Sequence, residues 1–422
     1  MTDPRPGLLG NAECDVAVIG GGLTGMVAAL RLAERGIDVS VLESKFCGWG
    51  SSSRNAGHLT PTIAGDPQVL ATVYRRRAPE LIRMADNAVH FAEKMIERLD
   101  IECEYDATGN VSAALTRGQL RRSERIAHIL RNAGGEVDFV MGNEWGLPPA
   151  FVGGVLERSG GILNPGKLAR GVRDVVLASN AKVYEQTPVE VLDSDNTGVR
   201  LRTPCGQIRA GRALLATNAY TRDLSFGPDR VVAPLWVTLA ETEPIDVERI
   251  RETGWSSRSG VYTQHLILEN YRLTPRNTIV FGTRFVQSPH GALADRLPDR
   301  AVVADLITGF RDRFPTLHDV EVHTAWSGWI AMTPSWLPVA GEVSPNIFYA
   351  MGYNGHGLAQ APYLGTLLAD RIAGDSPHDD LEVLWRKRKR FAAAPMFSSP
   401  ALKIGWKVDR TFDRLAERRS PK

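Results

Sequence analysis

Apolar positions near the N-terminus change their spacing twice within about thirty residues. Residues 16–19 form a short apolar run that ends at a glycine, as a buried parallel strand does. Residues 26–35 carry small and aliphatic side chains at helical spacing and stop at Gly36, a favourable C-terminal cap. A second apolar run begins at Val39. This order predicts a strand–helix–strand unit with parallel strands.

The same two spacings recur along the chain. Asn164 and Pro165 fit the cap and first position of a helix, and residues 213–217 and 347–350 are further short apolar strands. Helices are also expected at 79–99, 117–131 and 358–372, and a loop at 143–149. Antiparallel strands are expected at 182–191 with 198–208, and at 231–242, 261–274 and 278–286 within one sheet. The fold class is therefore α/β.

Composition excludes several classes. The chain has 422 residues, 43% hydrophobic and 23% charged, which is enough apolar material for a folded core. Its four cysteines are scattered without CxxC spacing, so neither a disulfide scaffold nor a metal site is predicted. No targeting signal or membrane-spanning run is apparent. A cytoplasmic, reducing setting is expected.

The formal net charge of +2 hides an asymmetry. Residues 386–422 carry 12 Lys and Arg against three Asp and Glu, a net of +9, whereas the rest of the chain sums to −7. This tail fits a membrane-surface helix, a segment that docks on a partner or on the acidic body, or a solvated helix face. Nucleic acid is not an expected partner, because no binding module is recognisable.

The first strand–helix turn has the spacing of a dinucleotide site. Gly20 permits the sharp turn, Gly22 lets a pyrophosphate approach the backbone, and Gly25 lets the helix pack close to the strand. The helix start at Leu23 and Thr24 offers N–H groups and a positive dipole end. Glu43 closes the second strand, where it can accept hydrogen bonds from a ribose. The acid favours FAD or NAD over NADP.

The segment that follows distinguishes FAD from NAD. Residues 47–60 are rich in glycine and serine, whereas an NAD domain would continue into another strand and helix. Arg54 can neutralise a pyrophosphate, and Gly57 would let the backbone approach a flavin ring. The predicted cofactor contacts of this loop are Ser51, Ser52, Ser53, Arg54, Asn55, Ala56 and Gly57. An ordinary flexible loop is the alternative.

A third glycine-rich segment lies near residue 355. A predicted strand at 347–350 leads into a loop with Gly352, Gly355 and Gly357, and then into a helix. The helix start again points toward a polar ligand. Such a loop can deliver N–H groups to the flavin pyrimidine.

These ordered segments resemble a known family. The chain is similar to the FAD-dependent amine and amino-acid oxidases of the D-amino-acid oxidase, glycine oxidase and sarcosine oxidase superfamily, and most similar to the branch that contains gamma-glutamylputrescine oxidase. The motifs that carry the resemblance are residues 48–57, 164–168, 216–220, 271–274, 281–284, 333–338 and 355–357. They span about residues 13 to 372 and indicate the superfamily, but not the substrate.

The resemblance implies a domain organisation. A Rossmann-like FAD-binding domain with the GxGxxG turn is expected in three pieces, at 1–78, 155–225 and 325–385. An interleaved α+β substrate domain with a mainly antiparallel sheet is expected at 79–154 and 226–324, followed by the basic tail at 386–422.

The resemblance also implies further cofactor contacts, at Val189, Thr217, Asn218, Gly352, Asn354, Gly355, His356, Gly357 and Leu358. Relatives that hold FAD covalently use a cysteine five residues before Thr333-Pro334, and this chain has Gly328 there. We therefore expect non-covalent FAD.

The candidate catalytic residues are Tyr262, Arg272, His265 and His58. Arg272 resembles a family position that can contact a substrate carboxylate, although Arg284 could do the same. Tyr262 fits a sheet-face residue equally well, and His265 a structural histidine. His58 stands where this branch tends to have Gln, so it is either a flavin neighbour or a solvated loop histidine. Trp326 and Trp329 are candidates for an aromatic substrate wall.

The predicted reaction is oxidation of a primary or secondary amine or amino acid. Hydride would pass to flavin N5, the imine would hydrolyse, and O2 would become hydrogen peroxide. Three alternatives remain: an amine dehydrogenase that uses a quinone or protein acceptor, a non-catalytic flavoprotein binding module, and a flavin hydroxylase. The hydroxylase is disfavoured because no Gly-Asp segment or second nucleotide motif is present.

Overall fold

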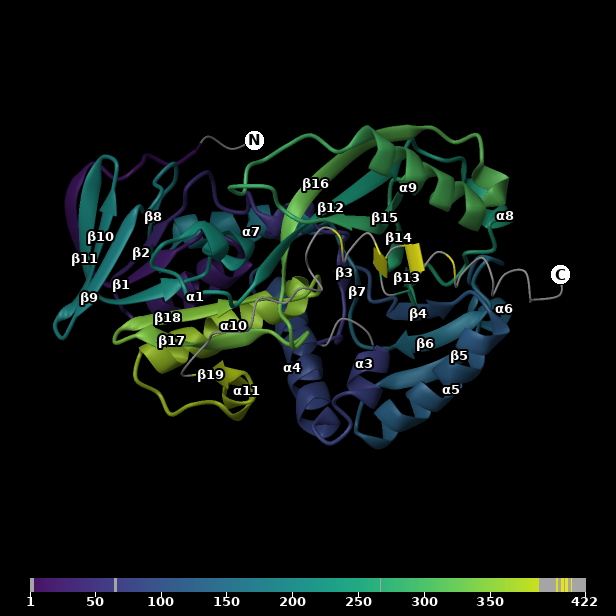
Figure 1. Cartoon of the computed structure of the whole chain (residues 1–422), viewed down its shortest axis with the longest axis horizontal. Coiled ribbons are helices and arrows are strands. Elements are labelled where there is room, and N and C mark those ends of the chain that lie inside the picture. The colour runs from purple at the N-terminus through teal and green to yellow at the C-terminus, as the bar shows by residue number, and fades with distance from the viewer. Residues whose placement is uncertain are drawn as a thin grey trace.

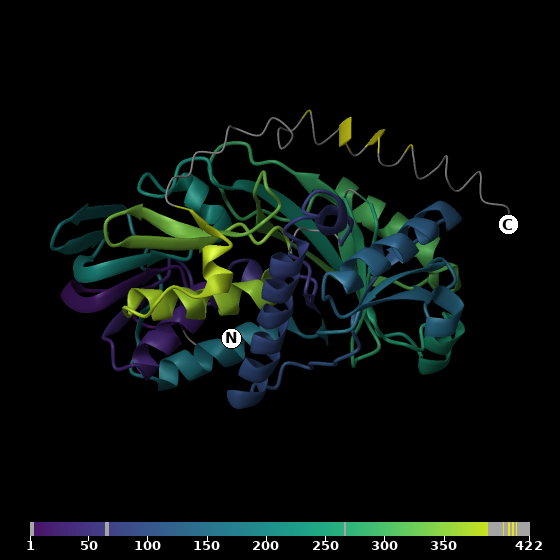
Figure 2. The same cartoon turned by 90° about the horizontal axis from the view of Figure 1, so that it is seen from below.

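Two large sheets organise the molecule. The computed structural model describes residues 4–63, 67–265 and 267–386, together with residues 400, 404, 405, 407, 408 and 411. The nine-stranded sheet lies to the left in Figure 1 and the eight-stranded sheet to the right. Helices α4 (Ala78–Arg98) and α10 (Gly357–Ile372) pack against each other between them, as Figures 1 and 2 show.

The nine-stranded sheet has the order β19-β17-β18-β11-β1-β2-β8, with β10 pairing β11 and β9 pairing β10. Its strands are β1 (Gly10–Ile19), β2 (Val39–Leu42), β8 (Lys182–Tyr184), β9 (Val191–Asp195), β10 (Gly198–Thr203), β11 (Gly206–Leu215), β17 (Val339–Ser344), β18 (Ile347–Met351) and β19 (Trp385–Arg386). Strand β1 runs parallel to both β2 and β11. This confirms the predicted Rossmann-like unit.

Both faces of this sheet are covered. Val16 and Val18 pack into a core shared with α1 (Leu23–Glu34), α7 (Pro165–Ala178) and α10. Ala17 and Ile19 point the other way, into a core formed with β9 and β10. Side chains alternate along a strand, so a strand buried on both faces is apolar throughout.

The eight-stranded sheet has the order β16-β12-β15-β14-β13-β4-β6-β5. Its strands are β4 (Asn110–Ala114), β5 (Val137–Met141), β6 (Gly153–Glu157), β12 (Ala233–Thr242), β13 (Gly260–Thr263), β14 (Glu269–Leu273), β15 (Ile279–Gln287) and β16 (Val322–Met332). Only the β4–β13 pair is parallel, so the sheet is mainly antiparallel, as predicted. Tyr271 and Phe281 pack on one face with Phe310 of α9 (Arg300–Arg313).

Shorter elements complete the chain. They are α2 (Ser51–Arg54), β3 (His58–Leu59), α3 (Pro67–Thr72), α5 (Arg117–Asn132), α6 (Gly142–Trp145), β7 (Gly161–Ile162), η1 (Asn218–Asp223), α8 (Val247–Glu252), η2 (Pro315–Leu317) and α11 (Asp379–Glu382). The Asn164 side chain accepts a hydrogen bond from Lys167 N at 3.2 Å, which confirms the predicted cap of α7.

Some local predictions need correction. The predicted loop at 143–149 contains most of the one-turn helix α6, which begins at Gly142. The predicted strand 182–191 is split, because β8 pairs parallel with β2 and only β9 pairs antiparallel with β10. The predicted strand 261–274 is likewise split into β13 and β14, which pair antiparallel.

The sheets cross the predicted domain boundaries. The predicted FAD-binding piece 155–225 begins within β6. That strand pairs with β4 and β5 in the eight-stranded sheet. Strand β16, which spans the predicted boundary at 325, pairs with β12 in the same sheet. Residue 155 lies within β6 and residue 325 within β16, so neither predicted boundary separates the two sheets.

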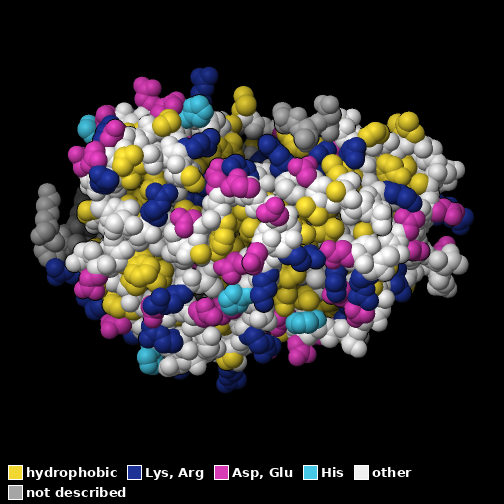
Figure 3. Space-filling model, turned by 180° about the vertical axis from the view of Figure 1, so that it is seen from behind, with side chains coloured by type: hydrophobic (Ala, Val, Ile, Leu, Met, Phe, Trp, Pro, Cys, Tyr) yellow, Lys and Arg dark blue, Asp and Glu magenta, His cyan; other side chains and the backbone are white. Residues whose placement is uncertain are grey.

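Charged side chains are mixed on the face seen in Figure 3, where Lys and Arg lie among Asp and Glu. Within the described ranges, no helix is long and apolar enough to cross a membrane. The predicted basic tail lies outside the described residues, apart from Arg386 and the six isolated positions.

Candidate active site

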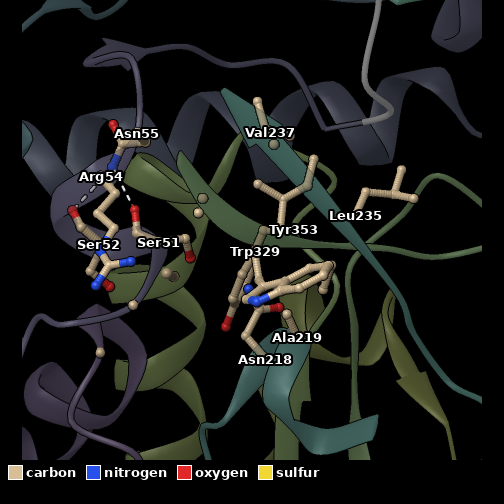
Figure 4. Close-up of a pocket in the computed structure, with 18 of the residues that line it drawn as sticks. Ser51, Ser52, Arg54, Asn55, Asn218, Ala219, Leu235, Val237, Trp329 and Tyr353 are labelled. Atoms are coloured by element: carbon tan, nitrogen blue, oxygen red, sulfur yellow. Dashed lines mark hydrogen bonds between the residues drawn. The ribbon is translucent and has the colours of Figure 1, made fainter. Parts of the chain in front are cut away.

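A cavity of about 1220 Å³ lies where the two sheets face each other. Its walls come from the β1–α1 turn, the 47–60 loop, the loop before α10, and strands β12 to β16. Figure 4 shows Ser51, Ser52 and Arg54 on one side, and Leu235 and Val237 on the opposite strand. The cavity therefore joins the three glycine-rich segments to the substrate sheet.

The β1–α1 turn is built by close backbone approach. Gly20 has a φ of +104°, and a Cβ on Gly25 would lie 2.0 Å from the Gly20 carbonyl oxygen. Gly25 does not line the cavity; it packs the helix against the strand, as predicted from its place in the motif. The N-cap residue of helix α1 is Gly22, which has no side chain to cap the helix.

Glu43 lies at the end of β2 and lines the cavity. Its two carboxylate oxygens accept hydrogen bonds from Gly21 N at 2.7 Å and Lys45 N at 2.8 Å. Burial raises the pKa of this carboxyl above its ordinary value. Each carboxylate oxygen has two lone-pair sites, so Glu43 can also accept from ribose hydroxyls.

The 47–60 loop surrounds helix α2. Ser52 Oγ accepts from Leu23 N at 3.0 Å, which ties this loop to the start of α1. The Asn55 amide donates to the Ser51 and Ser52 carbonyls, both at 3.0 Å, drawn as dashed lines in Figure 4. Ser53 donates to Gly48 O at 2.7 Å and does not line the cavity.

Arg54 lines the cavity and makes two contacts with other side chains there. Its guanidinium lies 3.3 Å from an Asp295 carboxylate oxygen and 4.0 Å above the Trp49 ring. Trp49 in turn donates to Asp295 at 3.0 Å. Asp295 belongs to the loop between β15 and α9, so the substrate sheet supplies the counterion of the predicted pyrophosphate arginine.

The loop before α10 is fixed to the rest of the site. Tyr353 Oη lies 2.6 Å from Thr24 Oγ1, and Asn218 Oδ1 accepts from Gly352 N at 2.9 Å. Asn354 Oδ1 accepts from Thr333 N at 2.8 Å. Gly352 itself does not line the cavity. Helix α10 starts after His356 without a side-chain cap, so its first N–H groups are directed at the site.

The far end of the cavity is reached by Val189. A buried ion pair joins Arg173 to Glu185, four residues before Val189, through two hydrogen bonds of 2.8 Å. Glu185 also accepts from Cys47 N at 2.8 Å. The pair therefore anchors the 47–60 loop on β8.

These features fit FAD. The starts of α1 and α10, a glycine turn and Arg54 suit a pyrophosphate, Glu43 suits a ribose, and the cavity extends as far as Val189 and the sheet. Gly328 lines the cavity where covalent relatives have a cysteine. No cluster of residues suited to a metal ion occurs in the part of the chain that the structure describes.

His58 presents an unprotonated nitrogen to the substrate end. Its Nδ1 lies 2.9 Å from Asn110 Oδ1, and the Asn110 amide nitrogen donates to two carbonyls, Leu59 O and Gly161 O. Carbonyls only accept, so Asn110 Oδ1 must accept and His58 Nδ1 must carry the hydrogen. Burial lowers the pKa of His58 to about 4. At neutral pH its Nε2 is therefore an acceptor, buried and without a partner among the described residues.

Two more acceptors line this end. Asn270 is 5% exposed, its Nδ2 donates to Thr283 Oγ1 at 2.8 Å, and its Oδ1 has no partner within the described residues. Tyr262 lines the cavity and its hydroxyl lies 3.3 Å from Thr62 Oγ1. Apolar walls surround these groups, among them Leu235, Val237 and Trp329.

Arg272 takes a different place from the one predicted for a substrate ligand. It does not line the cavity, and its Nε donates to Ala56 O at 2.7 Å. A Cβ on Gly57 would lie 2.7 Å from that Nε, so Gly57 makes room for the guanidinium. Burial lowers the pKa of Arg272 to about 10. Its role as a catalytic residue stays a prediction.

The alternative arginine is also engaged. Arg284 forms a buried ion pair with Glu269, which Arg313 joins at 3.0 Å. His265 lines the cavity, and its Nδ1 lies 2.9 Å from Thr263 Oγ1. Trp326 does not line the cavity; it donates to Arg54 O at 2.9 Å.

Most predicted site residues meet at this cavity. The lining set includes Gly20, Gly22, Leu23, Thr24, Glu43, Ser51, Ser52, Arg54, Asn55, Ala56, His58, Val189, Thr217, Asn218, Tyr262, His265, Asn354, Gly355, His356, Gly357 and Leu358. The predicted residues outside it are Gly25, Ser53, Gly57, Arg272 and Gly352. Sequence reasoning missed Trp49, Thr60, Gln264, Asn270 and Asp295. Trp49 and Thr60 lie within the 47–60 loop, whereas Gln264, Asn270 and Asp295 lie outside every motif described above.

Fold and site together define an oxidoreductase that binds a dinucleotide flavin. The chain belongs to the FAD dependent oxidoreductase family (DAO), whose model matches residues 15–371. The predicted family of FAD-dependent amine and amino-acid oxidoreductases is thereby confirmed, and so is FAD as the cofactor.

Similar proteins support this assignment. Gamma-glutamylputrescine oxidoreductase of Escherichia coli K12 is 30% identical over 378 residues, covering 87% of this chain and 85% of the relative. Glycine oxidase of Geobacillus kaustophilus is 26% identical over 375 residues, covering 85% and 92%. The crystal structure of that glycine oxidase matches 90% of this chain and all of its own, with a TM-score of 0.74 at 23% identity.

Proposed function

We propose that this protein oxidises a primary or secondary amine at the carbon that bears the nitrogen. When bound, FAD supplies the hydride acceptor, at its N5 atom, and its electrons then pass to O2 to give hydrogen peroxide. The neutral amine loses hydride from carbon and a proton from nitrogen and becomes an imine, which water hydrolyses to a carbonyl compound and ammonia or an amine. The chain must bind the amine, orient its carbon and accept its proton.

One observation carries the choice of an amine. The substrate end presents hydrogen-bond acceptors from three separate elements, namely His58 Nε2, Asn270 Oδ1 and the Tyr262 hydroxyl oxygen. Acceptors bind N–H donors, and an amine or ammonium group is rich in them. The neutral state of His58 also avoids repulsion of a cationic substrate.

The lack of a carboxylate clamp favours an amine over an α-amino acid. Among the described residues that line the cavity from β12 to β16, none is Arg or Lys. Arg272 is bonded to Ala56 O, and Arg284 to Glu269. Of the two relatives named above, one is named for an amine, gamma-glutamylputrescine, and the other for an α-amino acid, glycine. The absence of a clamp on this wall of the cavity suits the first kind of substrate.

Anaerobic mixing tests the proposal. The FAD-loaded protein is mixed with primary amines, diamines, N-methylamines and α-amino acids, and the flavin absorbance is followed. Bleaching by amines, at rate constants well above those for α-amino acids of similar size, is expected. Bleaching only by α-amino acids would overturn the choice of substrate, and bleaching by none would overturn the reaction.

The electron acceptor has its own test. Turnover with an amine that bleaches the flavin is measured by oxygen consumption and by reduction of a soluble quinone. We expect stoichiometric hydrogen peroxide in air. Turnover that requires the quinone would identify a dehydrogenase instead.

A further inference from the structure

A hydrogen-bonded chain leads from the substrate end into the protein. Tyr262 of β13 lies 3.3 Å from Thr62 Oγ1, and Thr62 Oγ1 donates to Glu157 Oε1 of β6 at 2.5 Å. Glu157 is 3% exposed and lies in a strand paired on both sides. A buried carboxylate at the end of such a chain calls for a function, because burying a charge is costly.

The direction of these hydrogen bonds is set by their chemistry. A carboxylate only accepts, so the single hydroxyl hydrogen of Thr62 goes to Glu157. Thr62 Oγ1 must then accept from the Tyr262 hydroxyl. Because Tyr262 uses its hydrogen on Thr62, its oxygen can act toward the main cavity, which Tyr262 lines, only as an acceptor.

Helix α10 also holds Thr62 in place. The Gln360 side chain of α10 donates to Thr62 O at 2.7 Å. Thr62 itself does not line the main cavity. The hydroxyl group thus lies between the cavity and the carboxylate.

A second, small cavity continues the path. It has a volume of about 30 Å³ and is bordered by Thr62, Glu157 and Asp86 of α4, which is enough space for a water molecule. Asp86 accepts from Ser159 Oγ at 3.4 Å and is partly exposed. Burial, with a smaller contribution from the nearby Glu136, raises the pKa of Asp86 to about 6, which suits a group that exchanges protons with neutral solution.

We infer that Tyr262, Thr62 and Glu157 form a proton relay that deprotonates the bound ammonium group before oxidation. This inference rests on the proposed amine oxidation. The ammonium N–H bond breaks as its proton bonds to Tyr262 Oη, the Tyr262 proton passes to Thr62 Oγ1, and the Thr62 proton passes to the Glu157 carboxylate. The products are a neutral amine and a neutral Glu157 carboxylic acid, and nothing is oxidised or reduced.

The proton leaves toward Asp86 through the small cavity. Thr62 and Glu157 act through Tyr262 and do not touch the substrate. The titratable groups of the path are Tyr262, Glu157 and Asp86. His356 faces Tyr262, with ring centroids 6.4 Å apart, and Glu136 and His90 lie beside Asp86. His58 lies on the other side of Asn110, the residue that pairs with Glu157 across β4 and β6.

Single-turnover kinetics against pH tests the relay. For Glu157→Gln and Thr62→Val, we expect flavin reduction by an amine to fall about 100-fold at pH 7. In both variants, the rate of flavin reduction should keep rising until the pH exceeds the pKa of the free amine. Above that pH the rate should approach the rate of the unchanged protein. Thr62→Ser keeps the hydroxyl and should restore most of the rate, whereas Glu144→Gln, an exposed acid on α6, should change nothing.

Infrared difference spectroscopy gives a readout that does not need turnover. An amine whose α-carbon bears no hydrogen can bind but cannot be oxidised. Its binding to the FAD-loaded protein should produce a carboxylic acid C=O band that is absent in Glu157→Gln. If Glu157→Gln fails to fold, the same band should be lost in Thr62→Val.

The outcomes separate the two proposals. An unchanged protein that no amine reduces contradicts the amine oxidation. Reduction of the unchanged protein, with identical pH profiles in all variants and no carboxylic acid band, overturns the relay and leaves the oxidation standing.

Discussion

The Asn110 side chain fixes the tautomer of His58, because its amide oxygen lies 2.9 Å from His58 Nδ1 while its amide nitrogen is held by two backbone carbonyls. Asn110, which does not line the cavity, therefore determines the tautomer in which His58 Nε2 is an acceptor. Gly260 makes this pairing possible, since a Cβ there would lie 2.2 Å from Asn110 Oδ1 and 2.5 Å from His58 Nδ1.

The depressed pKa of His58 predicts an acid-sensitive stability. The unfolded chain takes up this proton near pH 6.5 and the folded chain only near pH 4. Folding is therefore opposed increasingly as the pH falls from about 6.5 to 4. Relative to His58→Gln, the unchanged protein should lose about 2–3 kcal/mol of unfolding free energy between pH 7 and 4, measured with urea.

An exposed histidine provides the control. His290→Gln should follow the unchanged protein at every pH, because that side chain is exposed. A constant difference between His58→Gln and the unchanged protein across this range would contradict the assignment.

Gly25 is expected to tolerate no side chain. Its Cβ would meet the Gly20 carbonyl oxygen at 2.0 Å, so Gly25→Ala must separate α1 from β1. We expect a loss of about 2–4 kcal/mol in unfolding free energy and at least a tenfold weaker FAD affinity.

The matched substitution is Gly118→Ala, in the first turn of α5, where the nearest atom would lie 3.8 Å away. It should be neutral or stabilise by up to about 1 kcal/mol, because alanine favours helix. Equal effects of the two substitutions on FAD titration would show that the close approach does not matter.

The Arg54–Asp295 pair predicts opposite effects on cofactor affinity. Arg54→Gln removes a cation suited to the pyrophosphate and should weaken FAD binding by about 10- to 100-fold. Asp295→Asn removes a negative charge 3.3 Å from that cation and should strengthen binding by several-fold at low salt. Quenching of flavin fluorescence on adding apoprotein measures both, and a weaker affinity in Asp295→Asn would contradict this account.

Arg272 offers a test of substrate recognition. Since its Nε is bonded to Ala56 O, Arg272→Gln should disturb the loop that carries Gly57. We expect kcat/KM to fall by a similar factor for amines with and without a carboxylate. A loss confined to carboxylated substrates would instead restore the predicted carboxylate contact.

Local sequence patterns predicted the parts of the site that depend on backbone geometry. Gly20, Gly25 and Glu43 can be recognised in the sequence, because a tight turn, a closely packed helix and a bound ribose each require one residue type at one spacing. The glycine loop before α10 was recognisable for the same reason. These are the features that we expect to hold the cofactor.

The substrate end depends on contacts that no local pattern encodes. Asn270 and Arg272 are two residues apart in β14 and therefore share one face of the strand. Asn270 lines the cavity, whereas Arg272 lies against the Ala56–Gly57 backbone. No sequence motif includes Glu157, and its partner Thr62 lies 95 positions earlier in the chain. The pairing of β6 and β16 with the substrate sheet likewise depends on distant strands.

The bond between Thr24 and Tyr353 joins residues 329 positions apart. Strand β18 sits between β11 and β17, so the cofactor sheet gains its last central strand only after every strand of the substrate sheet has been made. During synthesis, the part of β11 that is not paired with β10, residues 213–215, is therefore an open edge until β18 leaves the ribosome. Cofactor capture should be one of the last events in the biogenesis of this enzyme, and a chain that stops before β17 should aggregate rather than bind FAD.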